Sequence, residues 1–355
     1  MILTWPTQTS KITDWVKPGD SSGEFKRQTS SFRSCISSAP GARFPPEAGR
    51  YHLYVSYACP WAHRTLITRK LKALEDVVSF SVVHWHLAEG GWRFVRPDAE
   101  EDAAVLDKNL NVVPSPVRGH EQFTHLRDVY LQSDPDYSAR VTVPVLYDTK
   151  TRTIVSNESS EILRMLNTEF NTLISDPVAA ALDLYPQPLR DDIEAAEKWH
   201  YDDINNGVYK SGFATTQDAY ERNVRTLFDA LDRVETHLAA RPASQQFWFP
   251  GDAPTEVDVR LFVTMIRFDP VYVQHFKCNV RDVRAGYPAI HLWLRNLYWR
   301  LPAFRETTVF EHIKKHYMIS HRQINPLGIV PVGPVPDVIP LDEEVPTAAK
   351  AVRAA

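Results

Sequence analysis

Apolar and polar residues alternate along residues 51–55, and a helical pattern follows soon afterwards. Leu53 and Val55 occupy every second position, which is the period of a half-buried strand. After Pro60, apolar residues recur every three or four positions, as on one face of a helix. Proline suits the first helical position because its missing N–H would have no partner there. The pattern therefore predicts a strand, a sharp turn and a helix that is capped by Cys59.

Three further strands are predicted before residue 175. Residues 77–85 and 153–155 carry the alternating or β-branched residues of strands, and residues 141–147 form another strand between them. Pro144 interrupts that strand, and because proline cannot donate a ladder hydrogen bond, it indicates a strand start or an edge. The first two strands and the helix between them make a βαβ unit, whose crossover is almost always right-handed.

Two helices and a polar insertion complete this half of the chain. Residues 86–136 are largely polar and contain one helical patch, at 123–131. Asn157 has the residue type of a helix N-cap, and the residues after it predict a helix over 158–167.

The hydrophobic period becomes helical throughout after a linker at 176–188, which its prolines mark. Thr255 and Asp258 have the spacing of a capping box at the start of one helix. The amphipathic segments lie near 189–207, 217–241, 256–268 and 289–300. The chain therefore divides into an N-terminal extension, an α/β domain, an all-helical domain and a proline-rich tail, at residues 1–50, 51–175, 176–325 and 326–355.

Composition narrows the class of partner. The chain has 355 residues, 43% of them hydrophobic and 24% charged, and a net charge of −4. This charge offers no basic surface for nucleic acid, and no apolar run reaches the roughly 18 residues of a membrane span. The first residues lack the pattern of a secretion signal or a transit peptide, so we expect a cytoplasmic protein that acts on small molecules. Three widely spaced cysteines do not predict a disulfide framework.

Cys59 is the candidate nucleophile. At a helix N-terminus, open N–H groups and the helix dipole favour a thiolate, which lowers a cysteine pKa from about 8.5 toward roughly 3.5–7.5. We therefore expect alkylation of Cys59 to be near its plateau at neutral pH. A redox Cys-x-x-Cys motif would place a resolving cysteine at position 62, where this chain has alanine. A lone thiolate needs a thiol from solution, for which glutathione is the obvious candidate. The alternative is an inert, buried cysteine.

Two other pairs of polar residues could serve either a structural or a functional role. Glu158 and Ser159 at a helix start suit either ordinary capping or an amino-acid-like ligand, whose carboxylate and ammonium they would bind. The pair His84 and His86 is half of a metal site, but no third ligand stands at a suggestive spacing, so no metal is expected.

Motifs throughout the chain resemble one family. The segment Cys59-Pro-Trp-Ala-His-Arg64 is similar to the active-site motif of the glutathionyl-hydroquinone reductases, the Xi class of the glutathione transferase superfamily. The resemblance extends from about residue 25 to 335, through segments that include 208–214, 267–272, 296–298, 312–317 and 320–330. It implies a thioredoxin-like N-terminal domain with a cis peptide bond before Pro144, followed by an all-helical glutathione-transferase domain.

The resemblance also implies an activity and a set of site residues. Members of this class remove glutathione from glutathionyl-hydroquinones through a cysteine mixed disulfide, which gives hydroquinone and oxidised glutathione; Cys59 would be that cysteine. Two tyrosines, Tyr209 and Tyr298, would supply a proton, and Tyr272 would line the acceptor pocket. The glutathione-binding residues would be Trp92, Arg127, Val143, Glu158 and Ser159. A homodimer is expected.

Other functions remain open at this point. The chain is also compatible with an Omega-like thiol transferase or dehydroascorbate-type reductase, and with a non-catalytic binding module on the same fold. A binding module has no need of an activated thiol, so the presence of Cys59 together with Glu158 and Ser159 favours an enzyme.

Overall fold

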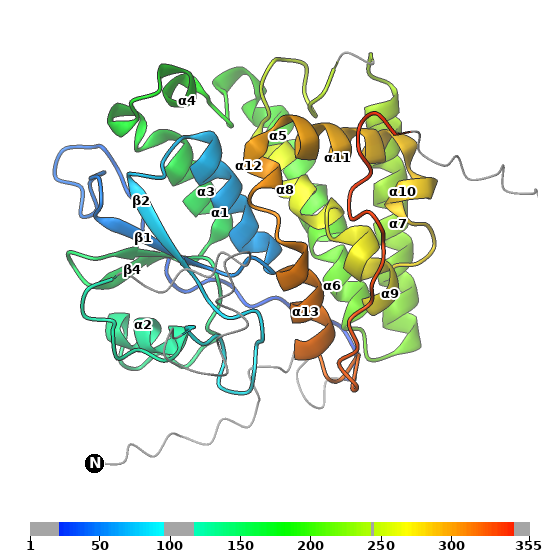
Figure 1. The fold of residues 1–355 in the computed structure, drawn as a ribbon, viewed down its shortest axis with the longest axis horizontal. Helices are drawn as coiled ribbons and strands as arrows, with labels where there is room; N and C mark the ends of the chain where they lie inside the picture. The colour runs from blue at the N-terminus through cyan, green and yellow to red at the C-terminus, as the bar shows by residue number, and fades with distance from the viewer. Residues whose placement is uncertain (1–20, 96–116, 243–244, 344–355) are drawn as a thin grey trace, which may run out of the picture.

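A four-stranded mixed sheet organises the N-terminal half of the protein. The computed structural model describes residues 21–95, 117–242 and 245–343 (Figure 1). Within the sheet the order is β2-β1-β3-β4, with β1 parallel to β2 and antiparallel to β3, and β3 antiparallel to β4. The strands are β1 (Tyr51–Val55), β2 (Val78–Val82), β3 (Val145–Asp148) and β4 (Thr153–Ser156). All five residues of β1 are buried, because this strand has a neighbour on both edges and helices over the sheet.

Helices cover both faces of this sheet. The helix α1 (Pro60–Leu71) packs beside α3 (Ser159–Thr168) on one side, and α2 (Leu126–Ser133) lies on the other, against β4 (Figure 1). This arrangement is the predicted thioredoxin-like fold, and the Val143–Pro144 peptide bond is cis, as the family resemblance implied. Pro144 immediately precedes β3, so its position at a strand start is also confirmed.

The C-terminal half is helical, as the change of period predicts. Its α-helices are α4 (Pro177–Ala181), α5 (Arg190–Trp199), α6 (Gly207–Gly212), α7 (Gln217–Ala239), α8 (Glu256–Met265), α9 (Val273–His275), α10 (Val283–Gly286), α11 (Pro288–Arg300), α12 (Pro302–Arg305) and α13 (Phe310–Ser320). Two 3₁₀-helices, η2 (Asn171–Leu173) and η3 (Gln187–Leu189), and two π-helical segments, η4 (His200–Asn205) and η5 (Phe268–Tyr272), connect them. All ten residues of α8 are buried at the centre of this half. The helix α13 was not among the predicted helices.

Helix caps explain where several of these elements begin. Cys59 is the N-cap of α1, with Pro60 at the first position, and Thr255 begins α8 with the predicted capping box. The predicted cap of α3 was wrong by one residue. Its N-cap is Glu158, whose carboxylate accepts the N–H of Ser160 at 3.2 Å, because the Asn157 side chain is already engaged with the N-terminal segment.

The two ends of the described chain run as irregular segments over the folded body. Residues 21–50, which we call the N-terminal arm, contain no helix or strand beyond an isolated bridge between Arg33 and Ser156. Near the other end, Trp299 Nε1 donates to the Ile339 carbonyl at 3.0 Å, which holds the proline-rich tail on α11. Residues 1–20 and 344–355 of the predicted extension and tail lie outside the described residues.

Two hydrophobic clusters form the core, one under the sheet and one among the helices. Ile67 of α1 and Leu163 of α3 belong to the helical cluster, so the contact between the halves is itself apolar. Within the described ranges, no helix has both the length and the apolar character needed to cross a membrane.

Candidate active site

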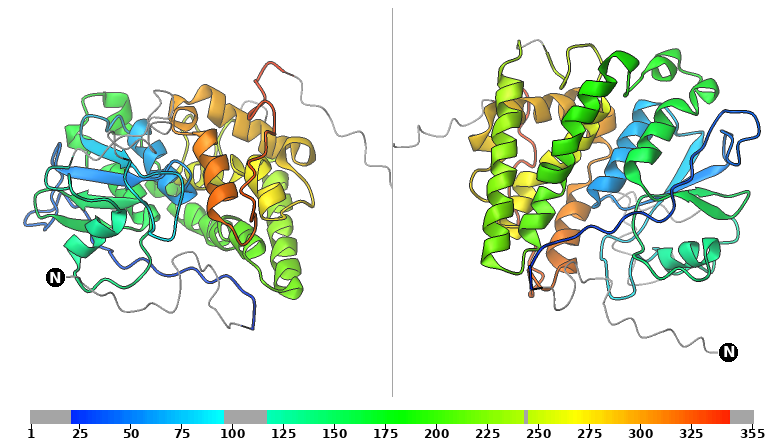
Figure 2. Two further views of the ribbon diagram at one scale, coloured as in Figure 1. Left: turned by 60° about the horizontal axis from the view of Figure 1, so that its bottom comes forward. Right: turned by 180° about the vertical axis from the view of Figure 1, so that it is seen from behind.

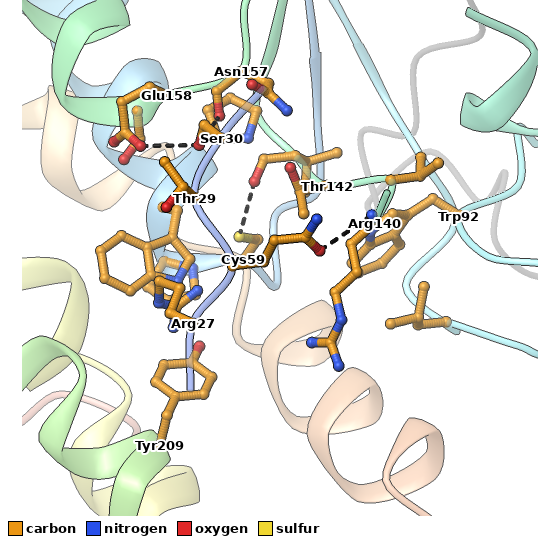
Figure 3. Close-up of a pocket in the computed structure, with 18 of the residues that line it drawn as sticks. Arg27, Thr29, Ser30, Cys59, Trp92, Arg140, Thr142, Asn157, Glu158 and Tyr209 are labelled. Atoms are coloured by element: carbon orange, nitrogen blue, oxygen red, sulfur yellow. Dashed lines mark hydrogen bonds between the residues drawn. The ribbon is translucent and has the colours of Figure 1, made fainter. Parts of the chain in front are cut away.

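A cavity of about 290 Å³ lies where the two halves meet (Figure 3). This volume is near the lower end of the range for small-molecule sites, roughly 300–1,000 Å³. Its walls come from the N-terminal arm, the starts of α1 and α3, the loop before β3, α6 and the end of α13. Of the predicted site residues, the cavity wall contains Cys59, Trp92, Val143, Glu158, Ser159 and Tyr209.

Cys59 stands at the bottom of this cavity, at the turn between β1 and α1. Its backbone is extended, with φ −78° and ψ 120°, which ends the strand and lets Pro60 begin the helix. The thiol lies 3.6 Å from the Val143 carbonyl oxygen, in a geometry that suits donation by the S–H group. The strand–turn–helix pattern therefore delivers a half-buried sulfur to an open cavity.

The turn that carries Cys59 is held from the helical half by Arg267. The Arg267 guanidinium donates to the carbonyl oxygens of Ala58 and Tyr57, at 3.0 and 2.9 Å. Arg267 is fully buried and follows α8, so it fixes the two residues before the nucleophile across the domain contact. Sequence reasoning missed this residue, although it begins one of the segments that resemble the family.

The predicted depression of the Cys59 pKa is wrong. Burial raises the pKa of the Cys59 thiol and outweighs the opposing effects of the Trp61 and Ala62 N–H groups and of the Arg267 and Arg27 charges. The Cys59 side chain makes no capping hydrogen bond at the start of α1. Cys59 keeps some exposure at the cavity, yet protein atoms surround its sulfur, and we take desolvation as the larger effect.

We therefore expect alkylation of Cys59 to increase with pH well beyond neutrality. A raised pKa leaves the thiol protonated at pH 7, and the reactive thiolate accumulates only above about pH 8.5. Iodoacetamide rates measured against pH in a Cys35→Ser background isolate Cys59, because Cys278 is fully buried. A rate that is already constant at neutral pH would restore the depressed pKa expected from the helix terminus.

Glu158 and Ser159 line the cavity at the start of α3, and Figure 3 shows Glu158 beside Ser30. The Glu158 carboxylate accepts hydrogen bonds from the hydroxyl groups of Ser30 and Ser160, at 2.9 and 3.0 Å, in addition to its capping bond. Burial acts to raise the pKa of Glu158, but these hydrogen bonds and the Arg64 charge outweigh it and keep the pKa below its usual value. The carboxylate is therefore ionised at neutral pH, and it caps the helix while facing the cavity.

The acceptor side of the cavity carries a chain of tyrosine hydroxyls. Tyr209 of α6 and Tyr317 of α13 both line the cavity, and their oxygens lie 2.7 Å apart. Tyr272 is completely buried behind them, 3.0 Å from the Tyr317 oxygen. Burial raises the pKa of all three hydroxyls, so they stay protonated at neutral pH.

Tyr298 lies outside the cavity wall. It stands near the end of α11, where its ring packs on Trp299 and Phe310, with centroids 4.9 and 6.3 Å apart. Tyr317, to which the sequence analysis assigned no role, does line the cavity. Its segment, 312–317, is one of those that resemble the family, so the sequence carries a signal for it.

Trp92 and Arg127 differ in their placement. Trp92 is buried in the cavity wall and stacks on His316, with ring centroids 5.1 Å apart. Arg127, on α2, is half-exposed and is not among the residues that line the cavity. The cavity wall contains three other arginines, Arg27 and Arg33 from the arm and Arg140 before β3, which sequence reasoning did not single out.

His84 and His86, the pair considered as half of a metal site, are engaged with each other instead. The rings of His84 and His86 lie 6.5 Å apart, and His84 Nδ1 accepts the His86 N–H. In residues 21–95, 117–242 and 245–343, no group of three His, Cys, Asp or Glu residues is arranged to hold a metal ion.

Comparison with known proteins identifies the family. The profile of the "Glutathione S-transferase, N-terminal domain" matches residues 58–169, and that of the "Glutathione S-transferase, C-terminal domain" matches residues 217–296. The Xi glutathione transferase ECM4 from Saccharomyces cerevisiae, solved in complex with glutathione, is 49% identical, with a TM-score of 0.79 over 88% of this chain and 100% of that chain. The chain belongs to the Xi class of glutathione transferases.

Relatives within this family carry two kinds of name. A Schizosaccharomyces pombe protein named "Glutathione S-transferase omega-like 2" is 54% identical over 92% of this chain and 97% of its own length. The "Glutathionyl-hydroquinone reductase YqjG" of Escherichia coli is 45% identical over 91% of this chain and 93% of its own length. The Xi-class fold is thus common to proteins named for different reactions.

Proposed function

We propose that this Xi-class protein is a glutathione-dependent reductase that removes glutathione from glutathionyl-hydroquinones. The observation that carries the proposal is the sharing of one cavity by the Cys59 thiol and the protonated Tyr209 hydroxyl. A thiol attacks the conjugate's sulfur and a phenol protonates the departing ring, so the reaction needs both groups on opposite sides of one carbon–sulfur bond.

The reaction divides into two balanced steps. In the first, the Cys59 thiolate forms a disulfide with the glutathionyl sulfur, the carbon–sulfur bond breaks, and its electron pair leaves with the ring, which takes a proton. In the second, the thiolate of free glutathione attacks that disulfide, so Cys59 is released and oxidised glutathione forms. Overall, the thiol of one free glutathione and the thioether sulfur of the conjugate are oxidised to one disulfide, and the ring carbon is reduced, which gives hydroquinone. Ala62 offers no resolving thiol, which is why glutathione performs the second step.

Glutathione would lie along the cavity from Cys59 to the start of α3. The N–H groups at the α3 N-terminus and the Ser159 hydroxyl suit its γ-glutamyl carboxylate, and the ionised Glu158 suits its ammonium group. The Val143 backbone beside the Cys59 sulfur would pair with the cysteinyl part, and Trp92 would cover the ligand from the cavity wall. Arg127 would act only if the ligand extends beyond the cavity toward α2.

An Omega-like thiol transferase is the second candidate, because one of the similar relatives has an omega-like name. That reaction uses the same Cys59 disulfide but has no aromatic leaving group to protonate. The two functions separate in one assay, which compares a glutathionyl-hydroquinone with a mixed disulfide of glutathione and a small alkyl thiol. We expect hydroquinone and oxidised glutathione to form in equal amounts from the first. Turnover of the alkyl disulfide alone would favour the thiol transferase, and turnover of neither would favour a binding module.

Loss of the Glu158 charge should weaken glutathione binding more than it slows turnover. The carboxylate meets an end of the ligand that is remote from the reacting sulfur, so its contribution is equal in the ground and transition states, and KM should increase with little change in kcat. Glu158→Gln is the variant of choice, because it retains an oxygen for the cap. Glu158→Ala would also remove the cap and cost roughly 0.5–2 kcal/mol of stability.

Steady-state kinetics against glutathione concentration test the role of Glu158. Ser160→Ala is the matched control, since it removes a hydroxyl bonded to the same carboxylate but keeps the charge. A loss of kcat in Glu158→Gln at unchanged KM would contradict a binding role.

The remaining expectations concern the whole protein. We propose a homodimer in the cytoplasm and domain boundaries at 51–175 and 176–325, as the sequence and the family resemblance indicate. Size-exclusion chromatography with light scattering tests the first of these, because a mass of one chain would exclude the dimer.

A further inference from the structure

The N-terminal arm crosses the cavity between the two halves of the protein. At one end, the Gly23 carbonyl accepts a hydrogen bond from the Thr215 N–H at 3.1 Å, and at the other, the Phe32 carbonyl accepts one from the Asn157 N–H at 3.1 Å. Figure 2 shows the arm, in dark blue, running from the helical half to the sheet. Arg27 lies between these two anchors, so the arm holds it over the contact between the domains.

The Arg27 side chain is fixed by aromatic rings. Its guanidinium carbon lies 4.2 Å from the ring centroid of Trp61, 5.0 Å from that of Tyr209 and 5.4 Å from that of Phe25. Its Nε donates to Asn206 Oδ1 at 2.7 Å. A guanidinium that is stacked and anchored in this way loses little entropy when it binds a ligand, since its orientation is already set.

One edge of this guanidinium has no protein acceptor. Arg27 Nη2 is buried and makes no hydrogen bond within the part of the chain that the structure describes, and no described carboxylate forms an ion pair with Arg27. Its charge acts to lower the pKa of both Cys59 and Tyr209, which shows that it lies within electrostatic reach of the nucleophile and of the proton donor. A buried, charged donor without an acceptor is a costly feature that an anionic ligand atom would relieve.

We propose that Arg27 is a catalytic residue, whose Nη2 group donates to the ring oxygen of the departing hydroquinone. This inference rests on the proposed function. Tyr209 first delivers its proton to the ring carbon that bears the sulfur and regains one from a ring hydroxyl, which leaves the ring as its keto tautomer. When the Cys59 sulfur then bonds to the glutathionyl sulfur, the electron pair of the carbon–sulfur bond passes through the ring to that oxygen, and aromaticity returns. Arginine stays protonated, so Arg27 stabilises the negative charge on the oxygen until it takes up a proton.

The surroundings of Arg27 favour an aromatic ligand over a glutathione carboxylate. Trp61 and Tyr209 place flat apolar surfaces beside the guanidinium, as a ring-shaped acceptor requires. The α3 N-terminus with Ser159 offers a separate site for a carboxylate, and in Figure 3 Arg27 lies on the Tyr209 side of Cys59, away from Glu158.

The test measures the two half-reactions of the Arg27→Gln variant separately by stopped flow. We expect the first, between reduced enzyme and a glutathionyl-hydroquinone, to slow by about 10²-fold, as for loss of one oxyanion donor. The second, reduction of the preformed Cys59–glutathione disulfide by glutathione, should change by less than about threefold, since no ring is present. Arg27→Lys should restore part of the first rate because it retains the charge. Arg43→Gln is the matched control, because this arginine of the same arm lies against Phe44 and is not among the residues that line the cavity.

Three outcomes overturn this role for Arg27. If the rates of both half-reactions and of the iodoacetamide alkylation of Cys59 fell by the same factor, Arg27 would act only by stabilising the Cys59 thiolate. A higher KM for glutathione alone would mean that it binds a carboxylate of the tripeptide. Unchanged rates would mean that it has no part in the reaction. Failure of the proposed function would give a different result. In that case the wild-type protein itself would release no hydroquinone from the conjugate.

Discussion

Cys59→Ser should abolish the release of hydroquinone from a glutathionyl-hydroquinone, with a loss on the order of 10³-fold or more. A serine hydroxyl is a far weaker nucleophile than a thiolate, and it cannot form the disulfide that stores the glutathionyl group between the two steps. Because burial raises the pKa of Cys59, wild-type kcat/KM should increase as the pH rises from about 7 to 9, whereas the serine variant should have no such dependence.

Cys35→Ser is the matched control for this result. Cys35 is an exposed thiol on the arm, so the same substitution there should leave turnover within about twofold of wild type. Mass spectrometry after incubation with oxidised glutathione should find one glutathione on Cys59 in the wild type and in Cys35→Ser, and none in Cys59→Ser. Full turnover by Cys59→Ser, or an adduct confined to Cys35, would exclude the mechanism.

Local patterns were sufficient to predict most of the fold. The proline after Cys59 and the capping box at Thr255 each depend on neighbours in sequence, and each has the predicted structure. Residues 51–55 form the predicted strand, but all five are buried, so the prediction of a half-buried strand was wrong. Elements that local patterns define weakly were missed or shifted. The cap of α3 is Glu158 because the distant arm uses Asn157, and no sequence pattern near α3 records that contact.

Local sequence patterns could not predict the properties of the site that depend on distant segments, such as the pKa of Cys59 and the identity of its neighbours. The pKa of Cys59 combines a helix terminus, which the sequence shows, with burial under both halves of the protein, which it does not. Tyr317 and Arg27 enter the cavity from opposite ends of the chain, and only the folded structure brings them to Cys59. Motif similarity marks the segment that contains Tyr317. It does not show which tyrosines face Cys59, so the role of proton donor was assigned to Tyr298 without knowledge of its place in the fold.

Removing the hydroxyl of Tyr209 should lower kcat more than removing that of Tyr317. Tyr209→Phe removes the hydroxyl that faces the cavity beside Cys59, and since general acids contribute about 10²- to 10⁴-fold, we expect kcat to fall by at least 10²-fold. Tyr317→Phe should lower kcat less, by about tenfold, because it removes the hydrogen bond to the Tyr209 oxygen but leaves the acid in place. KM for glutathione should change little in either variant.

Tyr298→Phe is the matched variant that decides between the two assignments. Its hydroxyl lies away from the cavity wall, on the side of α11 that meets Trp299 and Phe310, so kcat should stay within about twofold of wild type. A hydroquinone leaving group with a more acidic hydroxyl needs less proton transfer, so the Tyr209→Phe defect should shrink along a series of increasingly electron-poor rings. If Tyr298→Phe lost turnover while Tyr209→Phe and Tyr317→Phe kept it, the proton would come from α11, and the cavity next to Cys59 would not be the acceptor site.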